Sequence, residues 1–124
     1  MQALLHPEAE FQRHLEAGRF MLLQSRRNGA FVHPPRVAVP GSGDTDLQWV
    51  AASGRGTVHS TTTVRCKPPA SDYNVVLVDL AEGPRMMSTV VGIAPSEVRI
   101  GMPVHARVDR AEDGPRVVFV PLSF

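Results

Sequence analysis

The sequence has very little of what membrane, secreted or disulfide-bonded proteins rely on. It holds one cysteine, Cys66, among 124 residues, so an internal disulfide is excluded. No apolar run approaches the roughly 20 residues that a membrane-spanning helix needs. The first residues lack the basic start and long apolar core of a secretory signal. These absences predict a cytoplasmic protein that makes no contact with a membrane.

Charge and aromatic side chains are also sparse. The formal net charge is +1 and aromatic residues make up 6% of the chain. Such a balance does not favour a general nucleic-acid binder, which depends on many phosphate contacts. Between residues 13 and 43, however, only Glu16 opposes a set of five arginines: Arg13, Arg19, Arg26, Arg27 and Arg36. The set indicates either a local basic surface or scattered solvated side chains, and the sequence leaves both open.

The composition that remains is that of an ordinary globular domain, with 43% hydrophobic and 20% charged residues. Residues 7–18 predict a short helix, because Pro7 stands near its start, two acidic residues occupy the first turn and Gly18 follows. Phe11 and Leu15 are four residues apart and share one face. A helix this short is marginal alone, so we expect it to pack against the chain or a partner.

The rest of the chain predicts strands. Segments rich in β-branched or alternating apolar residues cover 19–24, 47–53, 57–64, 74–80, 85–91, 98–108 and 116–121. The alternation over 98–108 is the most regular, although Gly101 and Pro103 suggest a bend within it. Many short strands with almost no helix favour a small antiparallel barrel, with an open sandwich as the alternative.

Several blocks of the sequence, in order, resemble the DUF35 family of acyl-CoA-associated OB-fold proteins. They are LLQSRRNGAFVHPPR, VPGSGDTDLQWV, SGRGTVHSTTTV, NVVLVDLAEGPRMMSTVVG and RIGMPVHARV. The resemblance extends from about Phe11 to Phe124. It implies a mainly β protein with an N-terminal helix and a rubredoxin-like knuckle in residues 1–46, and a five-stranded antiparallel OB-fold barrel in residues 47–124.

The same resemblance bears on metal binding. The family's ribbon has two CxxC-like pairs, which map onto Ser25 and Asn28 and onto Val39 and Ser42. Structural zinc needs about four cysteine or histidine ligands, and His33 is the sole imidazole nearby. The knuckle is therefore degenerate, and we predict that the protein binds no zinc and has no metal site or other required cofactor.

Packing has to replace the metal in such a knuckle, since zinc binding contributes folding free energy directly. Phe31 and Val39 are the candidates for a small apolar core, and Pro34 with Pro35 restrict the unfolded chain. We expect this region to be less protected from hydrogen exchange than the barrel.

No arrangement of residues predicts catalysis. Gly54-Arg55-Gly56 is too short for a phosphate-binding P-loop and is better explained as a glycine-permitted bulge. His59 and His105 fall on polar strand faces without a nucleophile or carboxylate at an informative spacing. Trp49 is expected in the barrel core rather than as an exposed platform.

The function implied by the resemblance is that of a non-catalytic accessory or scaffold subunit. Its partner would be a thiolase-like enzyme or a hot-dog-fold hydratase acting on acyl-CoA. The candidate contacts with coenzyme A phosphates or an acidic partner surface are Arg26, Arg27, Arg36 and Arg55. The alternatives are a single-stranded nucleic-acid-binding OB-fold, with Trp49, Tyr73 and Phe119 as the main barrel aromatics, or a small acyl-CoA hydrolase.

Overall fold

The computed structural model describes residues 6–33, 45–68, 70–111 and 114–122. The predicted N-terminal helix is confirmed as α1, Pro7–Glu16. Pro7 occupies its first turn, where a missing N–H costs nothing, and Glu8 and Glu10 lie at its positive end. Leu15 is the buried anchor of its apolar face, and Gln12 Nε2 donates to the carbonyl of Pro115. The helix therefore packs against the chain itself.

A small antiparallel sheet follows the helix. It consists of β1 (Met21–Ser25), β2 (Phe31–Val32) and β3 (Leu47–Ala51), in the order β2-β1-β3. Strand β3 was expected among the barrel strands, but its partner is β1, from Met21 opposite Ala51 to Ser25 opposite Leu47. By its hydrogen bonds, β3 belongs to the small sheet. The domain boundary between residues 46 and 47, which separates the knuckle from the OB-fold barrel, stays a prediction.

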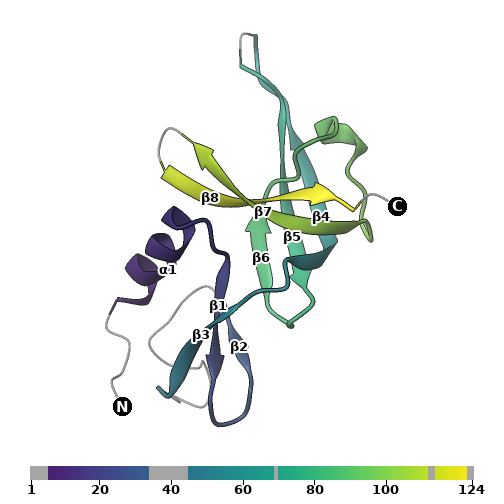
Figure 1. Ribbon diagram of the computed structural model, residues 1–124. Coiled ribbons are helices and arrows are strands. Elements are labelled where there is room, and N and C mark those ends of the chain that lie inside the picture. The colour runs from purple at the N-terminus through teal and green to yellow at the C-terminus, as the bar shows by residue number, and fades with distance from the viewer. Residues whose placement is uncertain (1–5, 34–44, 69, 112–113, 123–124) are drawn as a thin grey trace.

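The second sheet forms the barrel and has the order β6-β5-β4-β7-β8. Its strands are β4 (Arg55–Val64), β5 (Tyr73–Leu80), β6 (Arg85–Ser88), β7 (Pro103–Ala111) and β8 (Gly114–Pro121). Beyond β6 the chain forms a parallel bridge from Val90 to Phe119 of β8. This bridge joins the two ends of the sheet, so the strands curl into the predicted OB-fold barrel. Figure 1 shows this barrel above the small sheet, with α1 beside both.

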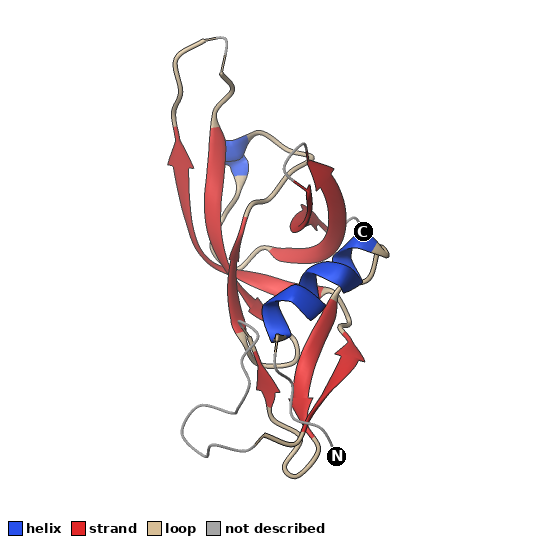
Figure 2. Ribbon diagram, turned by 90° about the vertical axis from the view of Figure 1, so that its left-hand side faces the viewer, coloured by secondary structure: helices blue, strands red, loops and turns tan. Residues whose placement is uncertain are grey.

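The barrel interior is lined by the alternating residues of its strands. Strand β5 shows the pattern most clearly, with Val76, Val78 and Leu80 at 4% exposure or less. Phe119 is fully buried and is the largest side chain of the core. Leu15 of α1 and Leu22 of β1 belong to the same cluster, so the helix and small sheet share the barrel's core. Figure 2 shows the helix lying at the junction of the two sheets.

The prediction of one strand over residues 98–108 was wrong. Strand β7 begins at Pro103, and the preceding residues make a turn in which Met102 N donates to Arg99 O and Gly101 has φ +86°. Val98 is buried, whereas Ile100 is 71% exposed. A left-handed glycine at this position of a turn breaks the alternation, so Ile100 does not reach the core. Strand β6 likewise ends at Ser88, short of the predicted residue 91. Between β6 and β7, residues Pro95–Glu97 form a 3-10 helix, η1.

In the part of the chain that the structure describes, no helix combines the length and apolarity required to cross a membrane.

Candidate functional site

The side chain of Ser25 holds the hairpin turn after β1. Ser25 is 1% exposed, and its Oγ accepts hydrogen bonds from the backbone N–H groups of Arg27 (3.2 Å) and Asn28 (3.4 Å). Gly29 N donates to Ser25 O at 2.9 Å, with Gly29 at φ +78°. The hydroxyl thus satisfies backbone donors that a turn of this kind leaves open.

A small apolar cluster supports this turn. Its buried members are Leu23, Val32 and Leu47, and the partly buried Trp49 packs against them. The predicted replacement core was therefore wrong in one residue, because Phe31 packs against the barrel cluster and its neighbour Val32 fills the knuckle. Val39, the other predicted member, lies outside the described residues. Trp49 was predicted in the barrel core and belongs instead to the small sheet.

Aromatic rings join the helix to the small sheet. The ring of Phe11 lies 5.7 Å from that of His33 and 6.2 Å from that of Trp49, and His14 lies 5.1 Å from Trp49. His33 Nδ1 and Trp49 Nε1 are buried and have no hydrogen-bond partner among the described residues. Burial lowers the pKa of His33, and it is also the main cause of a lowered pKa at His14. The cluster therefore favours neutral imidazoles.

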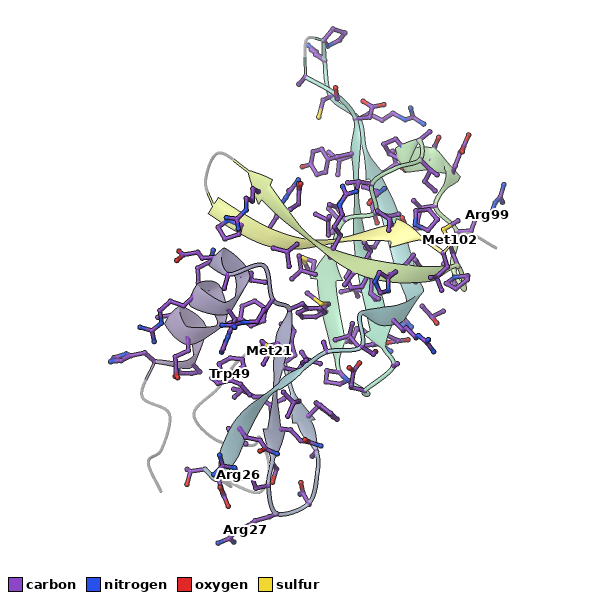
Figure 3. The ribbon with its side chains drawn as sticks, in the orientation of Figure 1. Met21, Arg26, Arg27, Trp49, Arg99 and Met102 are labelled. Atoms are coloured by element: carbon purple, nitrogen blue, oxygen red, sulfur yellow. The ribbon has the colours of Figure 1, made fainter. Side chains whose placement is uncertain are left out.

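Two of the four predicted contact arginines lie together. Arg26 and Arg27 are exposed at the tip of the β1–β2 hairpin, the lower end of the molecule in Figure 3. Arg26 Nη1 lies 3.6 Å from Asp46 Oδ1, so part of the local positive charge is balanced. Arg36 lies outside the described residues. The tip is thus a basic surface of smaller net charge than the arginine count suggests.

Arg55 does not join that pair. It begins β4, which follows the Ala51 end of β3, and Ala51 pairs with Met21 at the opposite end of β1 from Ser25. Strand β1 alone places roughly 13 Å between these ends. Arg55 is exposed and, within the described residues, makes no ion pair. The predicted set of contact arginines is therefore divided in the fold, with Arg55 apart from Arg26 and Arg27.

The backbone conformation at Gly54, the residue before Arg55, requires a glycine. Gly54 has φ +80°, and a Cβ there would lie 3.1 Å from Cε1 of His105. The β-bulge itself falls later, where the register of β4 shifts between Val58 and Ser60. A cavity of about 300 Å³ opens beside Gly54, between the end of α1, the small sheet and β7. Sequence patterns gave no indication of this cavity, because its walls come from three separate elements.

The bulge in β4 brings together a histidine and a carboxylate that sequence spacing did not associate. His59 Nδ1 lies 3.4 Å from Asp79 Oδ2, and Asp79 Oδ1 accepts a hydrogen bond from Arg85 Nε at 2.6 Å. The Arg85 hydrogen bond is the main reason that the pKa of Asp79 is lowered. Within the described part of the chain, no hydroxyl or thiol is hydrogen-bonded to His59. The cluster is an exposed ion-pair network without a nucleophile.

Metal binding has no support in the described residues, among which no three His, Cys, Asp or Glu side chains gather into a possible site. Two of the four positions that replace cysteines, Val39 and Ser42, fall outside this part of the chain. The absence of zinc stays a prediction.

These features define an OB-fold barrel that carries a three-stranded, knuckle-like sheet and an N-terminal helix. Residues 49–109 match the family described as the ChsH2 C-terminal OB-fold domain. The fold is similar to a solved chain of the Ltp2-ChsH2(DUF35) aldolase, with a TM-score of 0.83, 30% identity and coverage of 98% of both chains. The chain belongs to the DUF35 family.

Two relatives carry names that indicate a role. A probable enoyl-CoA hydratase alpha subunit from Thermomonospora curvata is 40% identical over 78% of this chain, which spans 30% of that relative's length. A DUF35 domain-containing scaffold protein from Pyrococcus furiosus is 28% identical over 78% of this chain and 74% of its own. The present chain thus corresponds to a minor part of the hydratase subunit and to most of the scaffold protein.

Proposed function

We propose that this protein is a non-catalytic accessory subunit of an enzyme complex that processes acyl-CoA. The observation that carries the proposal is its likeness along 98% of its length to the DUF35 chain of the aldolase. The name of the scaffold relative agrees with a supporting role. In this proposal the partner is a thiolase-like enzyme or a hot-dog-fold hydratase in the cytoplasm.

The described surface supports a contact role for arginines at two places. Arg26 and Arg27 project from a hairpin tip, and Arg55 stands exposed on the barrel without an ion pair among the described residues. Arginine forms paired hydrogen bonds with carboxylates and phosphates, so each place suits an acidic partner surface or coenzyme A phosphates. Arg36 is retained as a fourth contact on sequence grounds alone.

The alternatives receive less support. Of the three aromatics that could stack on nucleic-acid bases, Phe119 is 0% exposed, Trp49 lies in the small sheet, and Tyr73 alone is exposed on the barrel. One exposed ring is a poor stacking platform for successive bases. An acyl-CoA hydrolase would need an activated nucleophile, which His59 does not contact within the described residues.

The proposal is tested by co-expression with the enzyme encoded by a neighbouring gene, followed by size-exclusion chromatography. We expect co-elution, weakened in Arg55→Ala or in Arg26→Ala/Arg27→Ala, and unchanged in Arg99→Ala, which removes another exposed arginine. Calorimetric titration with coenzyme A and an acyl-CoA tests ligand binding. Failure to co-elute together with failure to bind either ligand would overturn the proposal, and turnover of an acyl-CoA by the isolated chain would establish the hydrolase.

A further inference from the structure

A groove of about 440 Å³ opens on the barrel where β6 separates from β5. Strand β6 pairs with β5 only as far as Ser88 opposite Val76, and the chain then crosses to Phe119 of β8. The first residues of β5 and of β8 are left as the two sides of an opening. The residues that line the groove include Tyr73, Asn74, Met87, Ser88, Thr89 and Arg116.

The walls of this groove are apolar and exposed. Tyr73 is 48% and Met87 is 69% exposed, and both line the groove. They are two of four large apolar side chains exposed in the described part of the chain, the others being Ile100 and Leu122. Apolar surface gathered in a concave site favours a ligand that removes it from water.

Most polar groups of the groove are already satisfied from within. Ser88 Oγ donates to Val117 O at 2.8 Å, and Thr89 Oγ1 donates to Asn74 Oδ1 at 2.9 Å. Asn74 Nδ2 donates to Val90 O at 3.0 Å. These bonds fix the floor of the groove and use the hydroxyl donors of Ser88 and Thr89.

Two exposed side chains of the groove, Tyr73 and Arg116, carry hydrogen-bond donors. The Tyr73 hydroxyl makes no hydrogen bond among the described residues. Arg116 Nη2 lies 3.7 Å from Asp109 Oδ2, which is too long for a hydrogen bond, so its guanidinium donors are available. A ligand that pairs with the Arg116 guanidinium carries a hydrogen-bond acceptor at one end. The nearby charge of Asp109 favours a singly charged anion over a phosphate, whose charge is about −1.5 to −2.

We propose that this groove binds an amphipathic carboxylate, with its apolar chain between Tyr73 and Met87 and its carboxylate on Arg116. The groove volume lies within the range of small-molecule sites. Arginine holds a carboxylate by two parallel hydrogen bonds, which fixes the polar end. The proposal does not depend on an enzyme partner, because every residue that forms the groove belongs to this chain.

Nuclear magnetic resonance titration of the full chain with octanoate, compared with uncharged 1-octanol, tests the site. We expect saturable shifts at the amides of Tyr73, Val75 and Met87, with octanoate binding at least fivefold more tightly than octanol. Arg116→Gln should weaken octanoate at least fivefold and leave octanol unchanged. Arg99→Gln removes an exposed arginine that does not line the groove and should change neither.

A second pair of variants tests the apolar wall. Met87→Asp places a carboxylate on the rim and should abolish octanoate binding, whereas Ile100→Asp, at a similarly exposed residue outside the groove, should not. Thermal melts confirm that each variant is folded. Non-saturable shifts, shifts centred on other residues, equal affinity for octanoate and octanol, or equal effects of the two variants in either pair would overturn the proposal.

Discussion

Asn74 holds the backbone of Val90 from both sides. Its Nδ2 donates to Val90 O at 3.0 Å, and its Oδ1 accepts from Val90 N at 2.8 Å. A side-chain amide here replaces the paired hydrogen bonds of a neighbouring strand. Because Val90 is also the residue that bridges to Phe119, this one buried side chain fixes the point at which the barrel closes.

Asn74→Ala should therefore destabilise the fold strongly. The change leaves the N–H and C=O of Val90 buried without partners, at roughly 1–3 kcal/mol for each group. We expect a lower midpoint in urea unfolding and loss of protection at Val90. The control is Thr62→Ala, at an exposed residue of the adjacent strand β4, and it should have little effect. An unchanged midpoint in Asn74→Ala would contradict this role.

Ser25→Ala should destabilise the knuckle without a metal being involved. The variant removes the acceptor for two backbone N–H groups, and the expected cost is about 0.5–2 kcal/mol by analogy with helix N-caps. Urea unfolding measures the loss, and Ser96→Ala, at an exposed serine in η1, is the matched control. Equal stability of the two variants would show that the hydroxyl does not hold the turn.

The knuckle should weaken in acid because of His33. Burial lowers its pKa from the usual 6.5, so the unfolded chain takes up a proton first as the pH falls. This contribution to the free energy of unfolding is fully present above pH 6.5 and is lost as the pH falls from there to the folded-state pKa. His33→Gln should reduce the slope of the free energy of unfolding against pH below pH 6.5. The reduction should be partial, since the pKa of His14 is also lowered. His6→Gln, at an exposed histidine, should retain the slope, and an identical slope in all three proteins would exclude His33 as the cause.

The purified protein should contain no stoichiometric zinc. Serine and asparagine are poor zinc ligands and valine is none, so the four positions that resemble a ribbon site offer no tetrahedral set. Inductively coupled plasma mass spectrometry measures the metal content directly. One zinc per chain, resistant to dialysis, would prove the prediction wrong.

Hydrogen exchange should show lower protection at the amides of β1 and β2 than at those of β4 and β5. Among the described residues, the apolar cluster of the knuckle has three buried side chains, whereas the barrel cluster has twelve, from Leu15 to Phe119. Local opening follows the density of buried contacts. Equal protection in the two regions would argue that partner-free packing suffices in the knuckle.

Sequence reasoning succeeded where the signal is local. The helix over Pro7–Glu16 and the strand over Tyr73–Leu80 both follow from short-range patterns of apolar and acidic residues. The barrel followed from their sum together with the family resemblance. Neither needed knowledge of distant contacts.

Prediction from the sequence failed where a distant strand or a single glycine decides which sheet a strand joins or whether a side chain is buried. Leu47–Ala51 reads as a strand in either sheet, and only its pairing with β1 assigns it. Ile100 fits an alternating pattern, yet the left-handed Gly101 turns it out to solvent. The groove beside Tyr73 and the His59–Asp79 pair arise from a strand that leaves its neighbour and from a bulge, and neither has a sequence signature.

The turn at Ser25 also has a chemical consequence. A hydroxyl that accepts backbone hydrogen bonds has no thiolate to be oxidised and needs no ion to be delivered after synthesis. If the predicted absence of zinc holds, neither a chelator nor a change in cellular redox state has a target at Ser25.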